Sequence, residues 1–486
     1  MRYRSSTMVI EKNYKHVFKY TGLFGGIQGL NILVGLVRNK IIALLLGPVG
    51  LGLISIYNTA STLLQNSTNF GLQISGVRAI SRAFDSGDTA EMNRHIRILR
   101  SWSLFAALLG AVVCLAASSC LSEWAFSSGD YTLEFMLLAP VVAMAAITGG
   151  ETAILKATRR LKQLARVSVL GVIGALAVSV PLFFRFGNDG IIPSIIIIAL
   201  VQMLLVTVHS YRYYPLAFTF RKSEFMEGRA MIAVGMAFVV AGVFGSGAEF
   251  AIRSFLSDMS VSLAGLYNAG YMITMTYAGM VFAAMETDYY PHLSAICSDT
   301  SKMNGAVNRQ IEVSLTIVSP MLVALMLSLP VLIPLLFSGK FMPVVGMTQI
   351  AILAMYFRAV NLPIAYIMLA KGDSLAYMLL ELVYDVLIVL TVIFGYNNWG
   401  LDGTGIALAV TGFIDCICVA CYCSWKYDLE ISGRLFRDFL LQLAIGLLAL
   451  AAVKFLAGWT YWIAGMAVLS SSIYVSFRMF RRRLHD

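Results

Sequence analysis

The feature that most constrains this chain is the recurrence of apolar segments about 20 residues long. About 20 apolar residues in a helix cross the hydrocarbon core of a bilayer, and the 486-residue chain holds 14 candidate segments of this kind. Within a membrane only helices and closed barrels satisfy their own backbone hydrogen bonds. The sequence therefore predicts an all-α integral membrane protein. The expected spans are 19–46, 51–77, 101–122, 133–156, 164–185, 190–211, 230–257, 260–288, 311–337, 347–370, 375–396, 403–425, 436–457 and 459–477.

Basic residues indicate on which side of the membrane each loop lies. Of the 36 Lys and Arg, 29 fall in, or within three residues of, the two terminal segments and every second loop. Cytoplasmic loops carry such an excess of positive charge. We therefore expect 14 spans with both termini cytoplasmic, although 12 spans would preserve the same pattern. The net charge of +10 follows this alternation and does not gather on one soluble face, which argues against a nucleic-acid partner.

An internal repeat indicates how the spans are grouped. VGLGLISIY at 49–57 resembles VSLAGLYNA at 261–269, an offset of 212 residues, and Arg38 aligns loosely with Arg253. Each copy would hold six spans that start on the same side. This pattern predicts two parallel six-helix lobes around a central cavity, an arrangement typical of transporters. The expected domains are an N-terminal lobe at 1–215, a C-terminal lobe at 216–430, and two further helices with a basic tail at 431–486.

The first expected span carries a polar stripe. Gln28, Asn31, Gly35 and Arg38 are spaced by 3, 4 and 3 residues, so they share one helical face. An arginine at mid-membrane costs about 2.5–3.5 kcal/mol on insertion scales, and the residues four positions before and after Arg38 are apolar. We therefore expect this stripe to line a cavity in which Arg38 meets an anion.

The second expected span is also rich in polar residues. Hydrogen bonding between helices would explain one or two of them, whereas five in one span favour a water-filled cavity. We take Gln65 and Asn69 as candidate substrate contacts. The five polar residues are Asn58, Ser61, Gln65, Thr68 and Asn69.

Charged residues recur in the first spans of the second half. Glu249 and Arg253 are four residues apart, the favourable spacing for an ion pair within one helix. The alternative is that Arg253 binds substrate and Glu249 binds a coupling ion. Tyr271 belongs to a tyrosine-rich stripe, and tyrosine offers sugars an apolar ring face and a hydroxyl group.

Three further charges lie in two later spans, and Arg358 and Asp385 lie at similar depth. Arg358 could pair with Asp385, which shares a helical face with Glu381. Alternatively, Arg358 contacts substrate, and Glu381 and Asp385 bind a coupling cation, Na⁺ or H⁺. Asp415 could join either arrangement. We expect no other cofactor.

Four cysteines at positions 416, 418, 421 and 423 have the spacing C-x-C-x-x-C-x-C. Because they lie in an apolar segment without histidine, we interpret them as packing residues and keep a metal or redox role as the alternative. The sequence holds no H-E-x-x-H, G-x-S-x-G or G-x-x-x-x-G-K-[ST] motif, and its loops are short. We therefore expect a protein that is not an enzyme.

Three short stretches resemble a known family. These are GLVRNKIIALLLGPVGLGLISIY at 35–57, LAGLYNAGY at 263–271 and YYPHLS at 289–294. The chain resembles the O-antigen (Wzx-type) polysaccharide-export flippases of the MOP exporter superfamily. Topology carries the likeness over nearly the whole length.

The resemblance implies a flippase of the bacterial inner membrane. Such proteins carry undecaprenyl-pyrophosphate-linked oligosaccharide to the outer leaflet by alternating access. Their partners are membrane lipids and, by expectation, polysaccharide polymerase machinery. In the related peptidoglycan lipid flippase an arginine at the position of Arg38 lines the cavity, and carboxylates of the second lobe bind a cation, which Glu381 and Asp385 match in spacing alone.

Departures from the peptidoglycan lipid flippase argue against lipid II as substrate. Ile32 and Leu33 stand where a second cavity arginine would be, and Asn39 stands in place of an acid. One alternative is a multidrug or small-molecule exporter of the same superfamily. Another is a membrane-embedded glycosyl- or acyltransferase, which would need an acid or histidine at a loop mouth.

Overall fold

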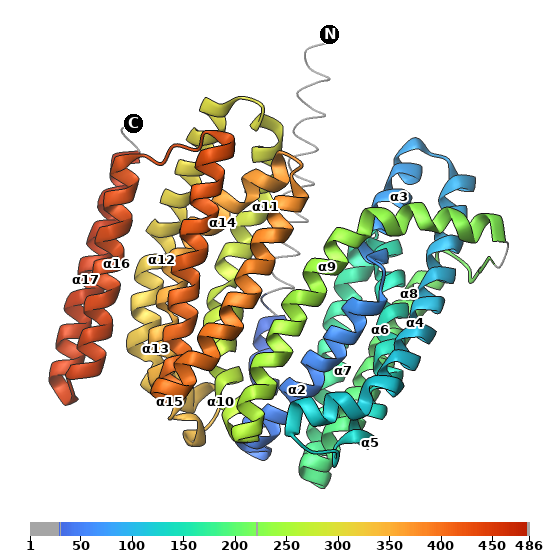
Figure 1. Ribbon diagram of the computed structural model, residues 1–486, viewed down its shortest axis with the longest axis horizontal. Helices are drawn as coiled ribbons and strands as arrows, with labels where there is room; N and C mark the ends of the chain where they lie inside the picture. The colour runs from blue at the N-terminus through green and yellow to red at the C-terminus, as the bar shows by residue number, and fades with distance from the viewer. Residues whose placement is uncertain (1–28, 30, 220–221, 484–486) are drawn as a thin grey trace. The chain divides into compact units, whose positions relative to one another are not determined.

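The structure is a computed structural model that describes residues 29, 31–219 and 222–483 (Figure 1). Residues 31–45 are helical, and this part of the chain contains no β-strand. The prediction of an all-α protein is confirmed. The helices that follow are α2 (Gly47–Thr68), α3 (Leu72–Ser86), α4 (Thr89–Phe126), α5 (Thr132–Met136), α6 (Ala139–Ala157), α7 (Leu161–Phe186), α8 (Ile191–Tyr211), α9 (Lys222–Met259), α10 (Val261–Tyr271), the π-helix η2 (Met272–Ala278), α11 (Met280–Ile296), α12 (Thr300–Leu336), α13 (Val344–Ala351), α14 (Leu353–Ala370), α15 (Ser374–Tyr427), α16 (Gly433–Phe455) and α17 (Gly458–Arg483).

Nine helices in the described residues are long and apolar enough to cross a membrane. Two of them each contain two of the expected spans. The helix Leu161–Tyr211 is made of α7 and α8, joined by the 3₁₀ turn η1 (Gly187–Gly190). In α15 the backbone leaves the helical conformation at Trp399 and at Gly400, whose φ is +60°. Glycine enters this left-handed region at little cost, so α15 divides where the sequence predicts two spans.

The second expected span is shorter than predicted. The prediction of one span over 51–77 is wrong, because α2 ends at Thr68 and α3 begins at Leu72. Between them Phe70 and Gly71 have φ values of +53° and +65°. A helix cannot continue through two left-handed residues, so α3 is a separate helix.

The described chain forms two compact units. The first unit contains the described residues through Leu46, then Leu64–Ser122 and Gly129–Val239. The second contains Gly47–Leu63, Glu123–Ser128 and the chain from Val240 onward. The domain boundaries at 215 and 430 stay a prediction.

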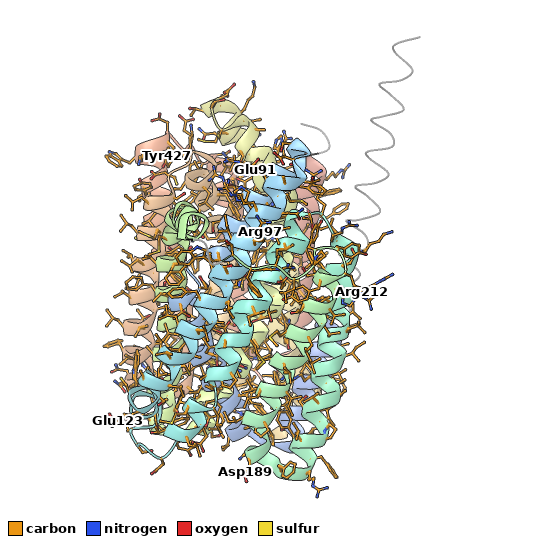
Figure 2. All side chains as sticks on the ribbon, turned by 90° about the vertical axis from the view of Figure 1, so that its right-hand side faces the viewer. Glu91, Arg97, Glu123, Asp189, Arg212 and Tyr427 are labelled. Atoms are coloured by element: carbon orange, nitrogen blue, oxygen red, sulfur yellow. The ribbon has the colours of Figure 1, made fainter. Side chains whose placement is uncertain are left out.

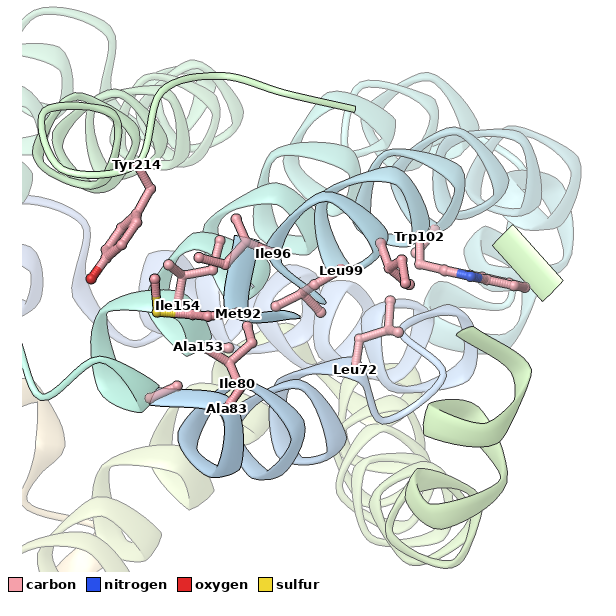
Figure 3. Packing of buried hydrophobic residues seen from close by; sticks show 13 residues of the cluster. Leu72, Ile80, Ala83, Met92, Ile96, Leu99, Trp102, Ala153, Ile154 and Tyr214 are labelled. Atoms are coloured by element: carbon pink, nitrogen blue, oxygen red, sulfur yellow. The ribbon is translucent and has the colours of Figure 1, made fainter. Parts of the chain in front are cut away.

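The first unit has a buried apolar core formed by α3, α4, α6 and the segment after α8, which is residues 212–219 (Figure 3). Ile96 and Leu99 lie on one face of α4 and contact Ile80 of α3 and Ile154 of α6 within this cluster. Their spacing follows the helical period, so a single face of α4 is buried. Tyr214 belongs to the same cluster, which fastens the segment after α8 to the helices.

Charged side chains lie toward the ends of the helices of the first unit. Figure 2 shows Glu91 near the top, Arg97 below it, Arg212 near mid-height and Asp189 at the bottom. The sequence predicts the first three on the cytoplasmic side and Asp189 outside. The side of the membrane on which each of these residues lies stays a prediction.

In the second unit, α2 and α10 approach each other at two glycines. A Cβ atom on Gly52 would lie 2.2 Å from the carbonyl oxygen of Val261, and one on Gly265 would lie 1.8 Å from the carbonyl oxygen of Pro48. Neither position has room for a side chain. The two backbones therefore touch directly.

Candidate functional site

Arg38 lies on the helix at 31–45 in the first unit, where its side chain is half-buried. Its Nε atom is buried and has no hydrogen-bond partner. Among the described residues no carboxylate forms an ion pair with it. A buried cation in this condition leaves strong hydrogen-bond donors unused.

The other members of the stripe differ in how they are held. Asn31 donates a hydrogen bond from Nδ2 to Ser168 Oγ at 2.7 Å, and its Oδ1 is buried without a partner. Asn31 thus keeps an acceptor available for a ligand or water. Gln28 lies outside the described residues.

Asn69 shapes the turn between α2 and α3. Its Oδ1 accepts a hydrogen bond from the Gly71 N–H at 2.8 Å, and its Nδ2 donates to Asn66 Oδ1 at 3.4 Å. An Asn that bonds a backbone group two residues ahead stabilises a turn. Gln65 is half-buried one turn earlier on α2. Substrate contact by Gln65 and Asn69 stays a prediction.

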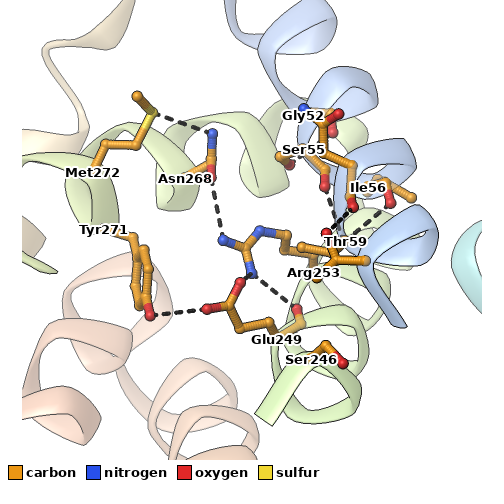
Figure 4. Close-up of polar contacts among 12 residues, drawn as sticks. Gly52, Ser55, Ile56, Thr59, Ser246, Glu249, Arg253, Asn268, Tyr271 and Met272 are labelled. Carbon is orange, nitrogen blue, oxygen red and sulfur yellow. Dashed lines mark hydrogen bonds and ion pairs between the residues drawn. The ribbon is translucent and has the colours of Figure 1, made fainter. Parts of the chain in front are cut away.

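Arg253 and Glu249 form the predicted ion pair in the second unit, with Nη1 and Oε2 3.1 Å apart (Figure 4). The arginine side chain is 5% exposed and the glutamate side chain 43% exposed. Arg253 also donates to Asn268 Oδ1 at 3.3 Å. The positive charge is therefore balanced within its own helix.

Tyr271 completes this network. Its hydroxyl group donates to Glu249 Oε1 at 3.2 Å, and its ring centroid lies 5.3 Å from the Arg253 guanidinium carbon. The cation over the ring adds an attractive contact. Substrate binding by Arg253 and Tyr271 stays a prediction.

A polar pocket opens within the second unit among η2, α14 and α15. It encloses about 750 Å³ of space, part of which opens outward. Arg358 is exposed there, and its guanidinium has one weak described contact, Nη1 to Met275 Sδ at 3.9 Å. Glu381 and Asp415 also line the pocket.

The pocket corrects one expectation about Arg358. The ion pair between Arg358 and Asp385 does not form, and Arg358 instead shares the pocket with Glu381 and Asp415. Asp415 accepts a short hydrogen bond from Asn361 Nδ2. The similar depth of Arg358 and Asp385 in the membrane does not determine whether their helices turn these side chains toward each other.

Asp385 faces a different part of the second unit. Its carboxylate oxygens lie 3.6 and 3.9 Å from the position of a Cβ atom on Gly245 of α9. It is within electrostatic range of Glu381 and Glu249. Among the described residues, no three His, Cys, Asp or Glu side chains lie close enough together to hold a metal ion, and coupling-ion binding by Glu249, Glu381 and Asp385 stays a prediction.

Sequence reasoning missed two polar residues of the pocket. Asn361 is three residues after Arg358, and Tyr384 is three residues after Glu381. A spacing of three places each on the face of its charged neighbour. That spacing was the available signal.

It also missed a buried ion pair in the first unit. Arg100 of α4 donates from Nε to Glu151 Oε1 of α6 at 2.7 Å and from Nη2 to Oε2 at 3.1 Å. The same guanidinium donates to the carbonyl oxygens of Pro215 at 2.8 Å and Tyr214 at 3.0 Å. This pair ties the segment after α8 to the helices.

The predicted site residues therefore fall into two groups. Arg38, Asn31, Gln65 and Asn69 belong to the first unit. The second unit brings Arg253, Tyr271 and Glu249 together in one network, and Arg358 and Glu381 together in one pocket.

Residues 41–346 match a family described as "Polysaccharide biosynthesis protein". The match covers well over half of the chain. The chain belongs to this family. The resemblance inferred from its motifs is confirmed at that level.

Solved structures share the fold of this polysaccharide biosynthesis protein. An inward-facing multidrug resistance MATE family transporter of the MOP superfamily has 14% identity and a TM-score of 0.69 over 82% of this chain and 94% of its own. The lipid II flippase MurJ, in an inward closed conformation, has 14% identity and a TM-score of 0.68 over 96% and 100%. A MOP superfamily transporter from Pyrococcus furiosus has 13% identity and a TM-score of 0.61 over 84% and 96%. No curated protein sequence matches the chain.

Proposed function

We propose that the protein is a flippase for a lipid-linked oligosaccharide. The lipid is undecaprenyl pyrophosphate, and the headgroup crosses the bacterial inner membrane by alternating access. The observation that carries this proposal is Arg38, a half-buried cation whose buried Nε atom has no hydrogen-bond partner and which has no counter-ion among the described residues. The family description and the transporter fold support it.

The physical argument starts from the substrate. A pyrophosphate cannot enter hydrocarbon unaided, because burying an unpaired charge costs many kcal/mol. A guanidinium can donate two parallel hydrogen bonds to phosphate oxygens. Arg38 would supply these bonds, and the substrate would neutralise the arginine in return. The free acceptor of Asn31 would hold a water molecule or a sugar hydroxyl group.

Cation coupling is a second part of the proposal. Glu249, Glu381 and Asp385 would exchange Na⁺ or H⁺ during the cycle, since carboxylates within membrane spans often mark ion pathways and proton relays. Both termini would be cytoplasmic, as the basic loops predict. Polysaccharide polymerase machinery would receive the product outside. The protein would carry out transport and no covalent chemistry.

The test is transport in proteoliposomes that hold the full-length protein and undecaprenyl-pyrophosphate-linked oligosaccharide. A membrane-impermeant sugar oxidant measures how much headgroup reaches the outer surface. We expect Arg38→Ala to abolish protein-dependent exposure. Arg38→Lys should retain part of it, since lysine keeps the charge and loses the two-pronged geometry.

The matched control is Lys40→Gln, which removes one positive charge from the same helix two residues away. We expect it to insert and to transport close to the wild-type rate. Normal transport by Arg38→Ala would contradict the proposed role of the arginine. Failure of the wild-type protein to expose any headgroup would refute the flippase itself.

One observation favours a second candidate, an exporter of organic cations. The second-unit pocket holds two carboxylates, one guanidinium and several tyrosines, and aromatic rings attract cations. Uptake of ethidium into inverted vesicles, abolished by Glu381→Gln, would support the exporter.

A further inference from the structure

The pocket of the second unit holds more polar groups than its own helices use. Within the described chain, the Glu381 carboxylate and the Tyr384 hydroxyl group have no hydrogen-bond partner. Asn361 Oδ1 is buried without one, although its Nδ2 donates to Asp415. Buried polar atoms are normally paired, so each exception calls for an explanation. A ligand rich in hydroxyl groups would supply the missing partners.

The charges of the pocket indicate which part of the substrate it would accept. Two carboxylates face one guanidinium, so the pocket is net negative when all three are ionised. Such a pocket repels pyrophosphate. A sugar hydroxyl group can donate to a carboxylate and accept from Arg358, whereas phosphate oxygens can only accept.

The shape of the pocket also suits a sugar ring. The rings of Tyr366, Tyr377 and Tyr384 line it, and an aromatic face packs well against the C–H face of a pyranose while its hydroxyl group stays polar. Two small residues, Ala354 and Gly412, also line the pocket.

We propose that this pocket binds one neutral sugar ring of the transported oligosaccharide. Glu381, Tyr384, Asn361 and Arg358 form its hydrogen bonds, and the tyrosine rings form its apolar wall. The inference rests on the proposed flippase function and divides the substrate in two: Arg38 takes the pyrophosphate, and the second-unit pocket takes sugar. The pocket thereby sets sugar specificity.

The test measures equilibrium binding to the full-length protein in nanodiscs with two probes. One probe is bare undecaprenyl pyrophosphate, and the other is the lipid-linked oligosaccharide extracted from the host cells. We expect Glu381→Gln and Tyr384→Phe each to weaken binding of the sugar-bearing probe by about five- to tenfold, the value of one hydrogen bond. Neither should change binding of the bare probe. Because Glu381 and Tyr384 have no described hydrogen-bond partner, both variants should fold normally.

Two further variants separate this inference from the proposed function. Arg38→Ala should weaken binding of both probes. Tyr356→Phe removes a hydroxyl group that donates to the Ser319 carbonyl oxygen at 3.4 Å, away from the pocket lining, and should change neither affinity.

Each contrary outcome has a distinct meaning. If Glu381→Gln and Tyr384→Phe bind the sugar-bearing probe as tightly as wild type, the sugar pocket is overturned. The same holds if they lose affinity equally for both probes. Neither result contradicts the proposed flippase function. Slower transport by Glu381→Gln with unchanged sugar affinity also overturns it and assigns Glu381 to the coupling ion. Binding of neither probe by the wild-type protein refutes the flippase. If the wild-type protein binds ethidium tightly through Glu381 and does not bind the sugar, the proposal of a sugar pocket is overturned and the pocket is assigned to organic cations.

Discussion

Removing Glu151 should release the segment after α8 from the first unit. Arg100 and Glu151 have side chains only 2% and 3% exposed, so solvent screens their interaction very little. The guanidinium makes four hydrogen bonds, two to Glu151 and two to the backbone of Tyr214 and Pro215. In Glu151→Ala the arginine would keep only the backbone bonds and remain buried without a counter-ion.

The size of the effect follows from this geometry. Breaking a buried ion pair by removing one partner costs about 3–5 kcal/mol, because the remaining charge is uncompensated. At about 1.4 kcal/mol per factor of ten, the open state of the segment should gain about two to three and a half orders of magnitude in population. The segment carries Arg212 and Tyr213, which are cleavage sites for trypsin and chymotrypsin.

Limited proteolysis measures this opening. When a segment opens and closes faster than the protease cuts, the cleavage rate follows the open population. We expect Glu151→Ala to be cleaved far faster than wild type in the segment after α8. The matched control is Asp85→Ala, which breaks the pair of Arg159 and Asp85 at 2.6 Å, with side chains 67% and 52% exposed. Exposed pairs contribute about 0–1 kcal/mol, so its rate should barely change. Equal cleavage of Glu151→Ala and wild type would refute the reasoning.

Two further predictions concern the second unit. Hydrogen bonds from Lys426 and Tyr427 hold the pKa of Asp373 well below its usual range. Its stabilising contribution is therefore complete above an ordinary aspartate pKa of about 3.9 and is lost as the pH falls toward the depressed value. Asp373→Asn should lower the melting temperature equally at pH 7 and pH 5, and the difference from wild type should shrink only below about pH 4; a difference that vanishes between pH 7 and pH 5 would contradict this. Gly265→Ala should lower the melting temperature, because its Cβ atom would meet backbone and overpacking costs about 1–3 kcal/mol or more. Gly171→Ala is the control and should leave the melting temperature unchanged, since a Cβ atom there would have no atom within 4 Å. Equal melting temperatures of the two variants would count against the close contact.

Much of the fold follows from the sequence because each membrane helix satisfies its own backbone hydrogen bonds. Hydropathy therefore locates the helices, including the two expected spans that the kink at Trp399 and Gly400 separates within α15. Local spacing predicts the pair of Glu249 and Arg253 for the same reason, since both partners lie on one helix.

The contacts between side chains of different helices could not be predicted from the sequence. Arg100 was counted as a cytoplasmic charge and Glu151 was not singled out, because nothing in a single sequence relates residues 51 positions apart. The predicted pair of Arg358 and Asp385 failed for the same reason. Depth follows from counting residues, but the direction in which a helix faces its neighbours depends on packing.

The glycine contact between α2 and α10 has a further property. Gly52 meets Val261, and Gly265 meets Pro48. A shift of 213 residues relates the two contacts, because it takes position 48 to 261 and position 52 to 265. The contact is thus reciprocal, as in the isologous interface of a two-fold symmetric homodimer. A side chain at either glycine is accommodated only if the opposing backbone moves away, so the contact constrains the sequence of both helices.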